Sequence, residues 1–336
     1  MSGKRNLLIC AGGTGGHIIP AITIGLSLER FNAVFVCGSR SIEKTIYEEY
    51  KIKPISLDLG SFSVVGYALK FPKNLLMSLL LIKRINPSSV LVAGNYTSGP
   101  VGLAAILLNK KLLAIEQDSL IGKANRIFAK FAYRIFTAYP PPFRHIDNRK
   151  GVFTGHVIRD GIRFPKKNLD DIEIESNRKK VLIIGGSQGA YSMTKALVSI
   201  LSDDDKYHLI VVAGKSSDRF ENKSNVTVLP YYKNMGYLYS LADIIIARSG
   251  ALSVAEIAYS NKPALFVPLP SASNDEQTKN VATLMKTNIQ FDFIPESRIT
   301  KEAVIRKLER IENLRGVNSQ SNDRFIQQIK IIEKYV

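Results

Sequence analysis

The sequence predicts an α/β protein built from two doubly wound, parallel-sheet domains. Strand-like apolar runs alternate with helix-like segments along almost the whole chain, and this alternation is typical of parallel sheets covered by helices on both faces. Two series of such segments each open with a glycine-rich turn, and a polar stretch at about 159–179 separates them. A chain of 336 residues is also longer than one hydrophobic core usually serves.

The strand-like runs define the expected domains. In the first series we expect strands at 6–10, 33–37, 55–57, 90–93, 112–115 and 134–137. In the second series we expect them at 180–184, 208–212, 226–229, 244–247 and 264–267. These series predict an N-terminal Rossmann-like domain at 1–158 and a C-terminal one at 159–320, with a last helix at 321–336 that packs back on the first domain. Ligands of open α/β sheets bind at the carboxyl ends of the strands, so we expect the site in a cleft between the domains.

The charge distribution indicates an anionic partner. The hydrophobic content of 45% and the charged content of 22% are ordinary for a globular protein, but the net charge is +17. Residues 1–158 hold 20 Lys and Arg against 8 Asp and Glu, which gives +12, and the remaining residues carry the other +5. Nucleic acid, an acidic membrane surface or a polyphosphate substrate would suit this charge. Because the basic residues are dispersed without interleaved aromatics, we expect no nucleic-acid partner.

Cysteines and apolar runs bear on location. Cys10 and Cys37 each end an apolar strand-like run and predict small buried hydrophobes rather than a disulfide or a metal site. The N-terminus reaches its glycine-rich turn within a dozen residues, which is not the pattern of a signal peptide. No apolar run approaches the roughly 20 residues that a spanning helix needs. We expect a cytoplasmic protein that does not cross a membrane.

The first glycine-rich turn, Gly12–Gly16, is followed directly by His17. It lies between an apolar run and a helix-like segment, so its backbone amides and the helix dipole would face an anion, with an imidazole within reach. The turn does not fit G-x-G-x-x-G, and Arg40 stands where an NAD enzyme needs an acidic residue. The Walker pattern is absent as well. The two commonest nucleotide-binding motifs are therefore excluded.

Two further stretches predict contacts with a nucleotide sugar. The segment Arg248–Glu256 follows an apolar run and begins a helix, where Ser249 and Gly250 would allow amides to hold a diphosphate. Glu256 lies one turn further on, at a suitable distance for ribose hydroxyls; a capping box of Ser253 and Glu256 without any ligand explains the pattern equally well. The segment Asn274–Asn280 begins another helix whose acid and amide groups would suit sugar hydroxyls.

Seven motifs in order give the chain a strong resemblance to one enzyme family. They are Gly12–His17 with Pro20; Asn95–Pro100; Glu116-Gln117 with Asn125; Thr154-Gly155 with Arg159; Gly185–Ala190; Arg248–Glu256; and Asp275, Gln277 and Asn280. With these motifs the chain resembles the MurG family, the bacterial UDP-N-acetylglucosamine transferases that convert lipid I into lipid II in peptidoglycan synthesis. The resemblance runs over roughly 10–290.

The resemblance implies the GT-B architecture of two facing Rossmann-like domains and an inverting transfer of GlcNAc without a cofactor or metal. Its partners would be UDP-GlcNAc, the undecaprenyl-linked acceptor lipid I and the anionic surface of the inner membrane, where the family works peripherally on the cytoplasmic face. The implied donor-binding residues are Thr14, Gly15, Gly16, Asp118, Arg159, Ser187, Tyr232, Ala251, Leu252, Ser253, Val254, Ala255, Glu256 and Gln277.

Individual roles follow from the matched positions. Ser187 and the helix start at Ala251 and Leu252 would bind the diphosphate, Glu256 the ribose and Gln277 the GlcNAc hydroxyls. Tyr232 would lie near the uracil, while Thr14, Gly15, Gly16 and Arg159 would close over the donor from the interface. His17 is the expected catalytic base, and a role as hydrogen-bond donor alone is equally compatible with the sequence.

The chain departs from the family pattern at Asn95, Ile115, Asp118 and His156. Asp118 puts a carboxylate where the family has an amide near the donor, which would weaken donor binding unless the basic first domain neutralises it. These positions bear on specificity more than on the reaction.

The leucine-rich segment 62–84, with lysines and an arginine on its flanks, has two interpretations. It suits peripheral membrane attachment, and it also suits an ordinary core helix with basic ends. Alternative functions are UDP-sugar transfer to another lipid such as diacylglycerol, UDP-GlcNAc 2-epimerisation, and non-catalytic binding of a nucleotide sugar.

Overall fold

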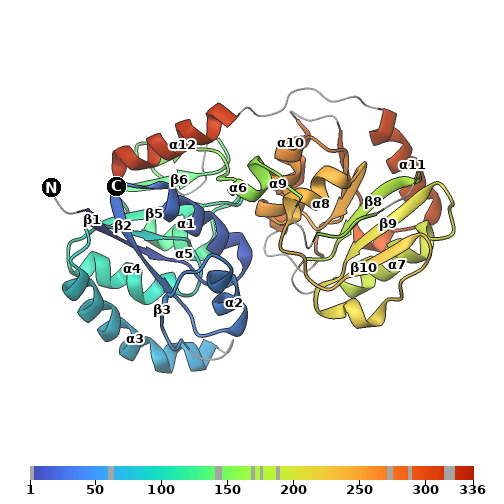
Figure 1. Cartoon of the computed structure of the whole chain (residues 1–336). Coiled ribbons are helices and arrows are strands. Elements are labelled where there is room, and N and C mark those ends of the chain that lie inside the picture. The colour runs from blue at the N-terminus through green and yellow to red at the C-terminus, as the bar shows by residue number, and fades with distance from the viewer. Residues whose placement is uncertain are drawn as a thin grey trace. The chain divides into compact units, whose positions relative to one another are not determined.

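The chain divides into two units, the first made of residues 1–157 and 322–336 and the second of residues 158–321. The computed structural model describes residues 4–59, 64–140, 146–167, 171–174, 177–186, 190–270, 275–286, 290–313 and 322–336. Each unit contains one parallel β-sheet with helices around it (Figure 1). The predicted fold class of two parallel-sheet α/β domains is therefore confirmed.

The first unit is a doubly wound sheet. Its strands are β1 (Arg5–Cys10), β2 (Phe31–Cys37), β3 (Ile55–Ser56), β4 (Ser89–Val92), β5 (Lys111–Glu116), β6 (Arg134–Thr137) and β7 (Gly151–Phe153). Its helices are α1 (Gly15–Ser27), α2 (Ser41–Glu49), α3 (Val64–Ile85), α4 (Ser98–Leu107), α5 (Lys123–Phe128) and α12 (Asn322–Tyr335). The strand order is β3-β2-β1-β4-β5-β6-β7, with every described pair parallel. The chain therefore changes direction across the sheet between β1 and β4.

The sheet of the first unit is apolar because both of its faces are covered. Leu8 and Cys10 of β1 belong to one cluster with residues of β4, α3 and α4, while Leu7 and Ile9 point to the opposite face and are equally buried. Strands that are buried on both faces need continuous apolar runs. For this reason the strands of this unit could be predicted from the sequence.

Helix α3 corrects one expectation. Its residues Val65–Ile85 are long and apolar enough to cross a membrane by length and composition alone. The sequence prediction missed this helix because Pro72, Lys73 and Asn74 interrupt its run of apolar residues. The mean hydropathy of the whole helix is high in spite of these three residues. In the structure α3 packs against α4, Ile82 is fully buried, and the Tyr67 hydroxyl donates to the Tyr96 carbonyl at 2.9 Å. One side of the helix is therefore part of the core of the first unit.

The C-terminal helix α12 belongs to the first unit. The ring of Tyr335 lies 6.1 Å from that of Phe136 on β6, and the Ser89 hydroxyl on β4 donates to the Val336 carbonyl at 2.7 Å. These contacts attach the end of the chain to the sheet formed by its beginning.

The second unit repeats the plan of the first. Its strands are β8 (Lys179–Ile184), β9 (Tyr207–Val212), β10 (Val226–Leu229), β11 (Ile244–Ala247), β12 (Ala264–Phe266) and β13 (Phe291–Phe293). Its helices are α6 (Asp160–Arg163), α7 (Tyr191–Leu201), α8 (Met235–Leu241), α9 (Ala251–Ser260), α10 (Glu276–Met285) and α11 (Lys301–Asn313), with short 3-10 turns η1 (Gly214–Arg219) and η3 (Glu296–Arg298). The order β10-β9-β8-β11-β12-β13 changes direction between β8 and β11.

The polar stretch 159–179 is more than a connector. Helix α6 packs against α8 and α9, and Ile162 is buried in the core of the second unit. Asp171 accepts hydrogen bonds from the Tyr232 hydroxyl at 2.7 Å and from the Asn234 amide at 2.6 Å. The stretch lacks periodicity because separate side chains, not a helical face, attach it to this unit.

Candidate active site

In each unit the polar motifs gather where the strand order reverses. The carboxyl ends of β1 and β4 carry the first glycine turn and the segment after Gly94, and those of β8 and β11 carry Gly185-Gly186 and Arg248–Gly250. In an open parallel sheet, this switch point is where ligands bind. The sequence motifs thus converge on the edge that the topology favours in both units.

In the first unit, the glycine turn leads into α1 and His17. Gly13 has a φ of +85°, a conformation that glycine adopts without strain. Thr14 is the exposed N-cap of α1, Gly15 and Gly16 form its first turn, and the His17 backbone N–H donates to the Thr14 carbonyl at 3.1 Å. The predicted residues Thr14, Gly15, Gly16 and His17 are therefore on one turn of backbone at the start of a helix.

His17 is held as a neutral imidazole. Burial lowers its pKa below the usual 6.5, and the Asp118 carboxylate opposes this shift in part. Its Nδ1 has no hydrogen-bond partner among the described residues. A buried, unpaired ring nitrogen at low pKa is able to accept a proton from a substrate hydroxyl at neutral pH.

Beside this turn, Glu116 organises the end of β5. Its two carboxylate oxygens accept from the backbone N–H groups of Asp118 at 3.1 Å and Gly122 at 2.8 Å, and from the Asn125 amide at 3.0 Å. Burial, and next the Asp118 charge, raise the pKa of Glu116 to about 7. The hydrogen bond from the Asp118 backbone N–H to the Glu116 carboxylate therefore holds the backbone of Asp118 in place.

The raised pKa of Glu116 predicts a pH-dependent stability. Between about pH 4.5 and 7 the folded state binds a proton that the unfolded state releases, so the free energy of unfolding falls as pH rises through this window. In Glu116→Gln this contribution disappears, and the difference between wild type and variant in urea melts at pH 5 and pH 7.5 isolates it. Equal pH slopes for the two proteins would contradict this assignment.

In the second unit, the described residues leave the ends of β8 and β11 uncrowded. Ala247 pairs with Ile184, so the residues after these two strands are neighbours. A Cβ added at Gly186 or at Gly250 would meet no described heavy atom within 4 Å. Gly250 is the N-cap of α9, whose first backbone bond joins the Val254 N–H to the Gly250 carbonyl. The earlier N–H groups of α9 are thus available at an uncrowded helix N-terminus, the arrangement that binds phosphates.

Glu256 lies one turn into α9 and is buried. Its Oε1 accepts from Arg159 Nε at 2.8 Å, and its Oε2 accepts from Arg159 Nη2 at 3.1 Å and from the Tyr239 hydroxyl at 3.4 Å. The capping-box interpretation is wrong, because the helix begins at Ala251 and the carboxylate pairs with Arg159 instead of a helix end. Two predicted site residues, Arg159 and Glu256, are therefore brought together.

The other predicted donor residues are spread over the same unit. Ala251, Leu252, Ser253, Val254 and Ala255 form the first turns of α9, with Ala251, Val254 and Ala255 buried. The Tyr232 hydroxyl is taken by Asp171, and the Gln277 side chain accepts from the Leu269 N–H at 3.0 Å, so neither side chain points freely at a ligand in this structure. Ser187 lies outside the described residues.

Comparison with known proteins places the chain in a family. Residues 7–137 match the glycosyltransferase family 28 N-terminal domain, and residues 180–334 match its C-terminal domain. A relative from a Sulfurihydrogenibium species, named UDP-N-acetylglucosamine--N-acetylmuramyl-(pentapeptide) pyrophosphoryl-undecaprenol N-acetylglucosamine transferase, is 32% identical over 91% of this chain and 89% of its own. The chain belongs to glycosyltransferase family 28.

Solved structures of family 28 and of other enzymes share the fold. The crystal structure of Acinetobacter baumannii MurG matches with a TM-score of 0.71 and 25% identity, over 97% of this chain and 95% of that one. UDP-GlcNAc 2-epimerase from Neisseria meningitidis, bound to UDP-GlcNAc, matches with a TM-score of 0.69 over 98% of both chains. At 15% identity the second likeness concerns the fold alone.

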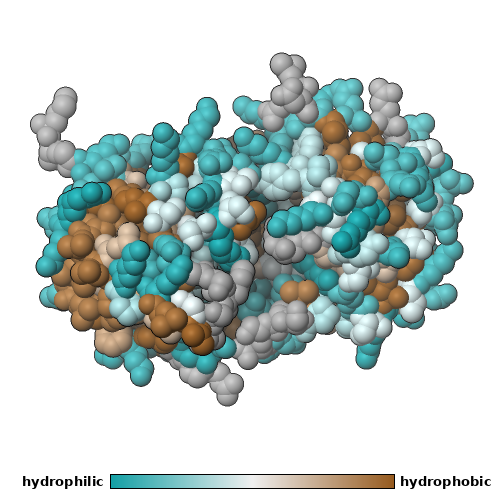
Figure 2. All heavy atoms as spheres, turned by 90° about the horizontal axis from the view of Figure 1, so that it is seen from below, coloured by the Kyte–Doolittle hydropathy of each residue, from teal (hydrophilic) through white to brown (hydrophobic). Residues whose placement is uncertain are grey.

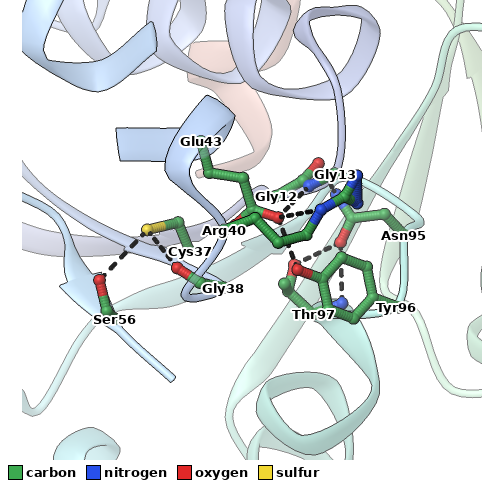
Figure 3. A network of polar contacts seen from close by, with 10 residues as sticks. All are labelled: Gly12, Gly13, Cys37, Gly38, Arg40, Glu43, Ser56, Asn95, Tyr96 and Thr97. Atoms are coloured by element: carbon green, nitrogen blue, oxygen red, sulfur yellow. Dashed lines mark hydrogen bonds and ion pairs between the residues drawn. The ribbon is translucent and has the colours of Figure 1, made fainter. Parts of the chain in front are cut away.

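Two features of this family 28 chain were not readable from its sequence. His156 lies edge-on to Tyr139 with ring centroids 4.9 Å apart, and burial lowers its pKa to about 4, so it is neutral at physiological pH. The other feature is Glu43, a fully buried acid whose carboxylate contacts the first glycine turn (Figure 3). In the sequence Glu43 resembles the acids at 48 and 49 of the same helix, and no spacing distinguishes it.

Proposed function

We propose that the chain is an inverting glycosyltransferase that moves GlcNAc from UDP-GlcNAc to the 4-hydroxyl of MurNAc in undecaprenyl-pyrophosphoryl-MurNAc-pentapeptide, converting lipid I into lipid II. Membership in family 28 and the activity for which the relatives are named support this reaction. The observation that carries the donor side is the switch point of the second unit, where open glycine positions and a helix N-terminus adjoin a buried carboxylate.

The donor diphosphate would bind at the ends of β8 and β11. Backbone amides after Gly185 and at the start of α9 would donate to its oxygens and stabilise the charge that develops on UDP as it leaves. Glu256 would accept from the ribose, because a carboxylate has about four acceptor sites and the described partners of Glu256 occupy three. We further propose that Ser187 binds the diphosphate and that Gln277 binds the GlcNAc hydroxyls.

His17 would act on the acceptor. Its neutral imidazole takes the proton from the 4-hydroxyl as the oxygen attacks the anomeric carbon, and the bond from that carbon to the UDP oxygen breaks. One direct displacement inverts the α-linked donor into a β(1→4) product.

For the lipid-linked acceptor we propose peripheral membrane contact through α3. Val65, Leu69, Leu76 and Leu80 are each more than half exposed and follow helical spacing, so they form one stripe along α3. An amphipathic helix usually buries its apolar side chains and exposes its polar ones. Helix α3 departs from this rule in part, because polar Asn74 is buried while the leucines of the stripe are exposed. Seen from below in Figure 2, hydrophobic residues gather on the first unit, on the side where α3 lies in Figure 1. Such a stripe with basic flanks suits an interface with anionic lipid.

We expect the protein to sediment with anionic liposomes at low salt and much less with neutral phosphatidylcholine vesicles. Replacing Leu69, Leu76 and Leu80 together with glutamine should abolish sedimentation without lowering the melting temperature, since these side chains are exposed. Binding that persists in the triple variant, or no binding by the wild type, would refute the membrane role of α3.

The acceptor class separates the proposal from its main alternative. UDP release from UDP-GlcNAc should depend on a lipid I analogue and not occur with diacylglycerol. Release with diacylglycerol instead would support UDP-sugar transfer to another lipid, and donor binding without release would support a non-catalytic binding protein.

A further inference from the structure

The glycine turn of the first unit already contains an anion of its own. Glu43, the third residue of α2, is fully buried, and its Oε1 accepts from the Gly13 N–H at 2.8 Å and from the Tyr96 hydroxyl at 2.5 Å (Figure 3). Arg40 Nε is 3.9 Å from the same oxygen. The other oxygen, Oε2, has no hydrogen-bond partner among the described residues.

This carboxylate occupies the position that a ligand phosphate takes in many glycine-rich turns. Such turns bind phosphates because their N–H groups are unpaired, and here the Gly13 N–H is already used. A second anion at the same amide would be repelled by Glu43. The turn is therefore organised internally and is not available at Gly13 for the donor diphosphate.

The turn is also held from the β4 side. Asn95 Nδ2 donates to the Gly12 carbonyl at 2.6 Å, while Asn95 Oδ1 accepts from the Thr97 N–H at 3.0 Å. Added Cβ atoms would lie 2.6 Å from Thr97 Cγ2 at Gly12 and 2.2 Å from the Tyr96 hydroxyl oxygen at Gly38, so these side chains pack closely against the glycine backbone. Figure 3 shows Glu43 approaching the turn from α2, and Asn95, Tyr96 and Thr97 approaching it from the segment that follows β4.

We infer that Glu43 is a positioning residue, which fixes the Gly12-Gly13 backbone so that the first turn of α1 presents His17 to the acceptor hydroxyl. Because Glu43 is fully buried, it would act through the Gly13 amide, four residues before the imidazole. The inference rests on the proposed function, because His17 is the base only in that reaction. The two glycine turns then have different roles. The turn at Gly12-Gly13 positions the base, and the turn at Gly185-Gly186 binds the diphosphate.

Substitution of Glu43 tests this assignment. Glu43→Ala should lower kcat about 10- to 100-fold with an unchanged KM for UDP-GlcNAc, because misplacing a reacting group by about 1 Å costs up to this factor. Glu43→Gln keeps an acceptor oxygen for the Gly13 N–H and should recover much of the loss. Glu48→Gln, an exposed acid on the same helix, is the matched control and should behave as wild type.

A spectroscopic measurement keeps the test independent of activity and of a folding defect. In protein labelled selectively at glycine and histidine, Glu43→Ala should shift the Gly13 amide resonance and the His17 ring resonances and leave Gly250 in place, whereas Glu43→Gln should bring them back towards their wild-type positions. Loss of kcat together with these shifts supports the assignment. Unchanged Gly13 and His17 resonances, or a loss that appears in donor KM instead of kcat, would overturn it. If wild type transfers no GlcNAc, the proposed function fails, and the resonances still decide whether Glu43 positions His17.

Discussion

Replacing His17 with alanine is expected to lower kcat by a factor of about 10²–10⁴, the usual contribution of a positioned general base. The donor KM should change little, because the donor is proposed to bind in the other unit. Stopped assays of UDP release over a range of UDP-GlcNAc concentrations separate the two parameters.

His17→Gln is the variant that decides between the two roles of this residue. Glutamine donates a hydrogen bond but does not take a proton at neutral pH. If His17→Gln restores near-normal turnover, His17 is only a hydrogen-bond donor.

The pH profile gives a second test of the base. The neutral form is the active one and burial lowers the His17 pKa, so kcat/KM should hold below pH 6.5 and fall only as pH drops through the lowered pKa. Because the Asp118 charge raises this pKa, Asp118→Asn should move the acid limb to still lower pH. A limb that stays in place in Asp118→Asn would contradict the coupling of these two residues.

Glu256→Ala is expected to affect stability and donor binding together. The side chains of Arg159 and Glu256 are 15% and 3% exposed, so removing the acid takes a carboxylate away from a largely buried guanidinium, at a cost of about 3–5 kcal/mol in the free energy of unfolding. The KM for UDP-GlcNAc should rise as well if the carboxylate contacts the ribose. Urea unfolding and donor titration measure the two effects separately.

Matched variants separate the pair from general charge effects. Asp147→Asn breaks an exposed pair with Arg149 and should leave the free energy of unfolding nearly unchanged, because solvent screens this pair. The double variant Glu256→Ala with Arg159→Met should be more stable than Glu256→Ala, because it no longer buries a guanidinium that has lost its carboxylate. A Glu256→Ala protein with wild-type stability and donor KM would remove Glu256 from both roles.

The sequence was sufficient for the elements whose burial imposes a pattern. Continuous apolar runs predicted the strands from β1 to β6 and from β8 to β12, and glycine turns after the first strand of each series predicted the two switch points. Strands β7 and β13 were missed because neither is a continuous apolar run: β7 begins with Gly151, and β13 contains Asp292. That buried acid is paired with Lys307 and Arg310 of α11, which no local pattern reveals.

The candidate site residues that the sequence predicted are those whose local sequence context forms a recognisable pattern. The glycine turns, His17 and the start of α9 have such patterns, because helix starts at strand ends need particular residue types. The Arg159–Glu256 pair joins residues 97 positions apart, and the contact of Glu43 with Gly13 spans 30. Contacts of this kind depend on the order of the strands in the sheet, because that order decides which distant segments of the chain become neighbours.

The most direct test of the central claim is the structure of the product formed from UDP-GlcNAc and a lipid I analogue. Mass spectrometry and NMR of the isolated lipid should show one added GlcNAc, joined by a β(1→4) bond to MurNAc, with one UDP released for each disaccharide. Free GlcNAc with no disaccharide, or an α-linked product, would contradict an inverting transfer to lipid I.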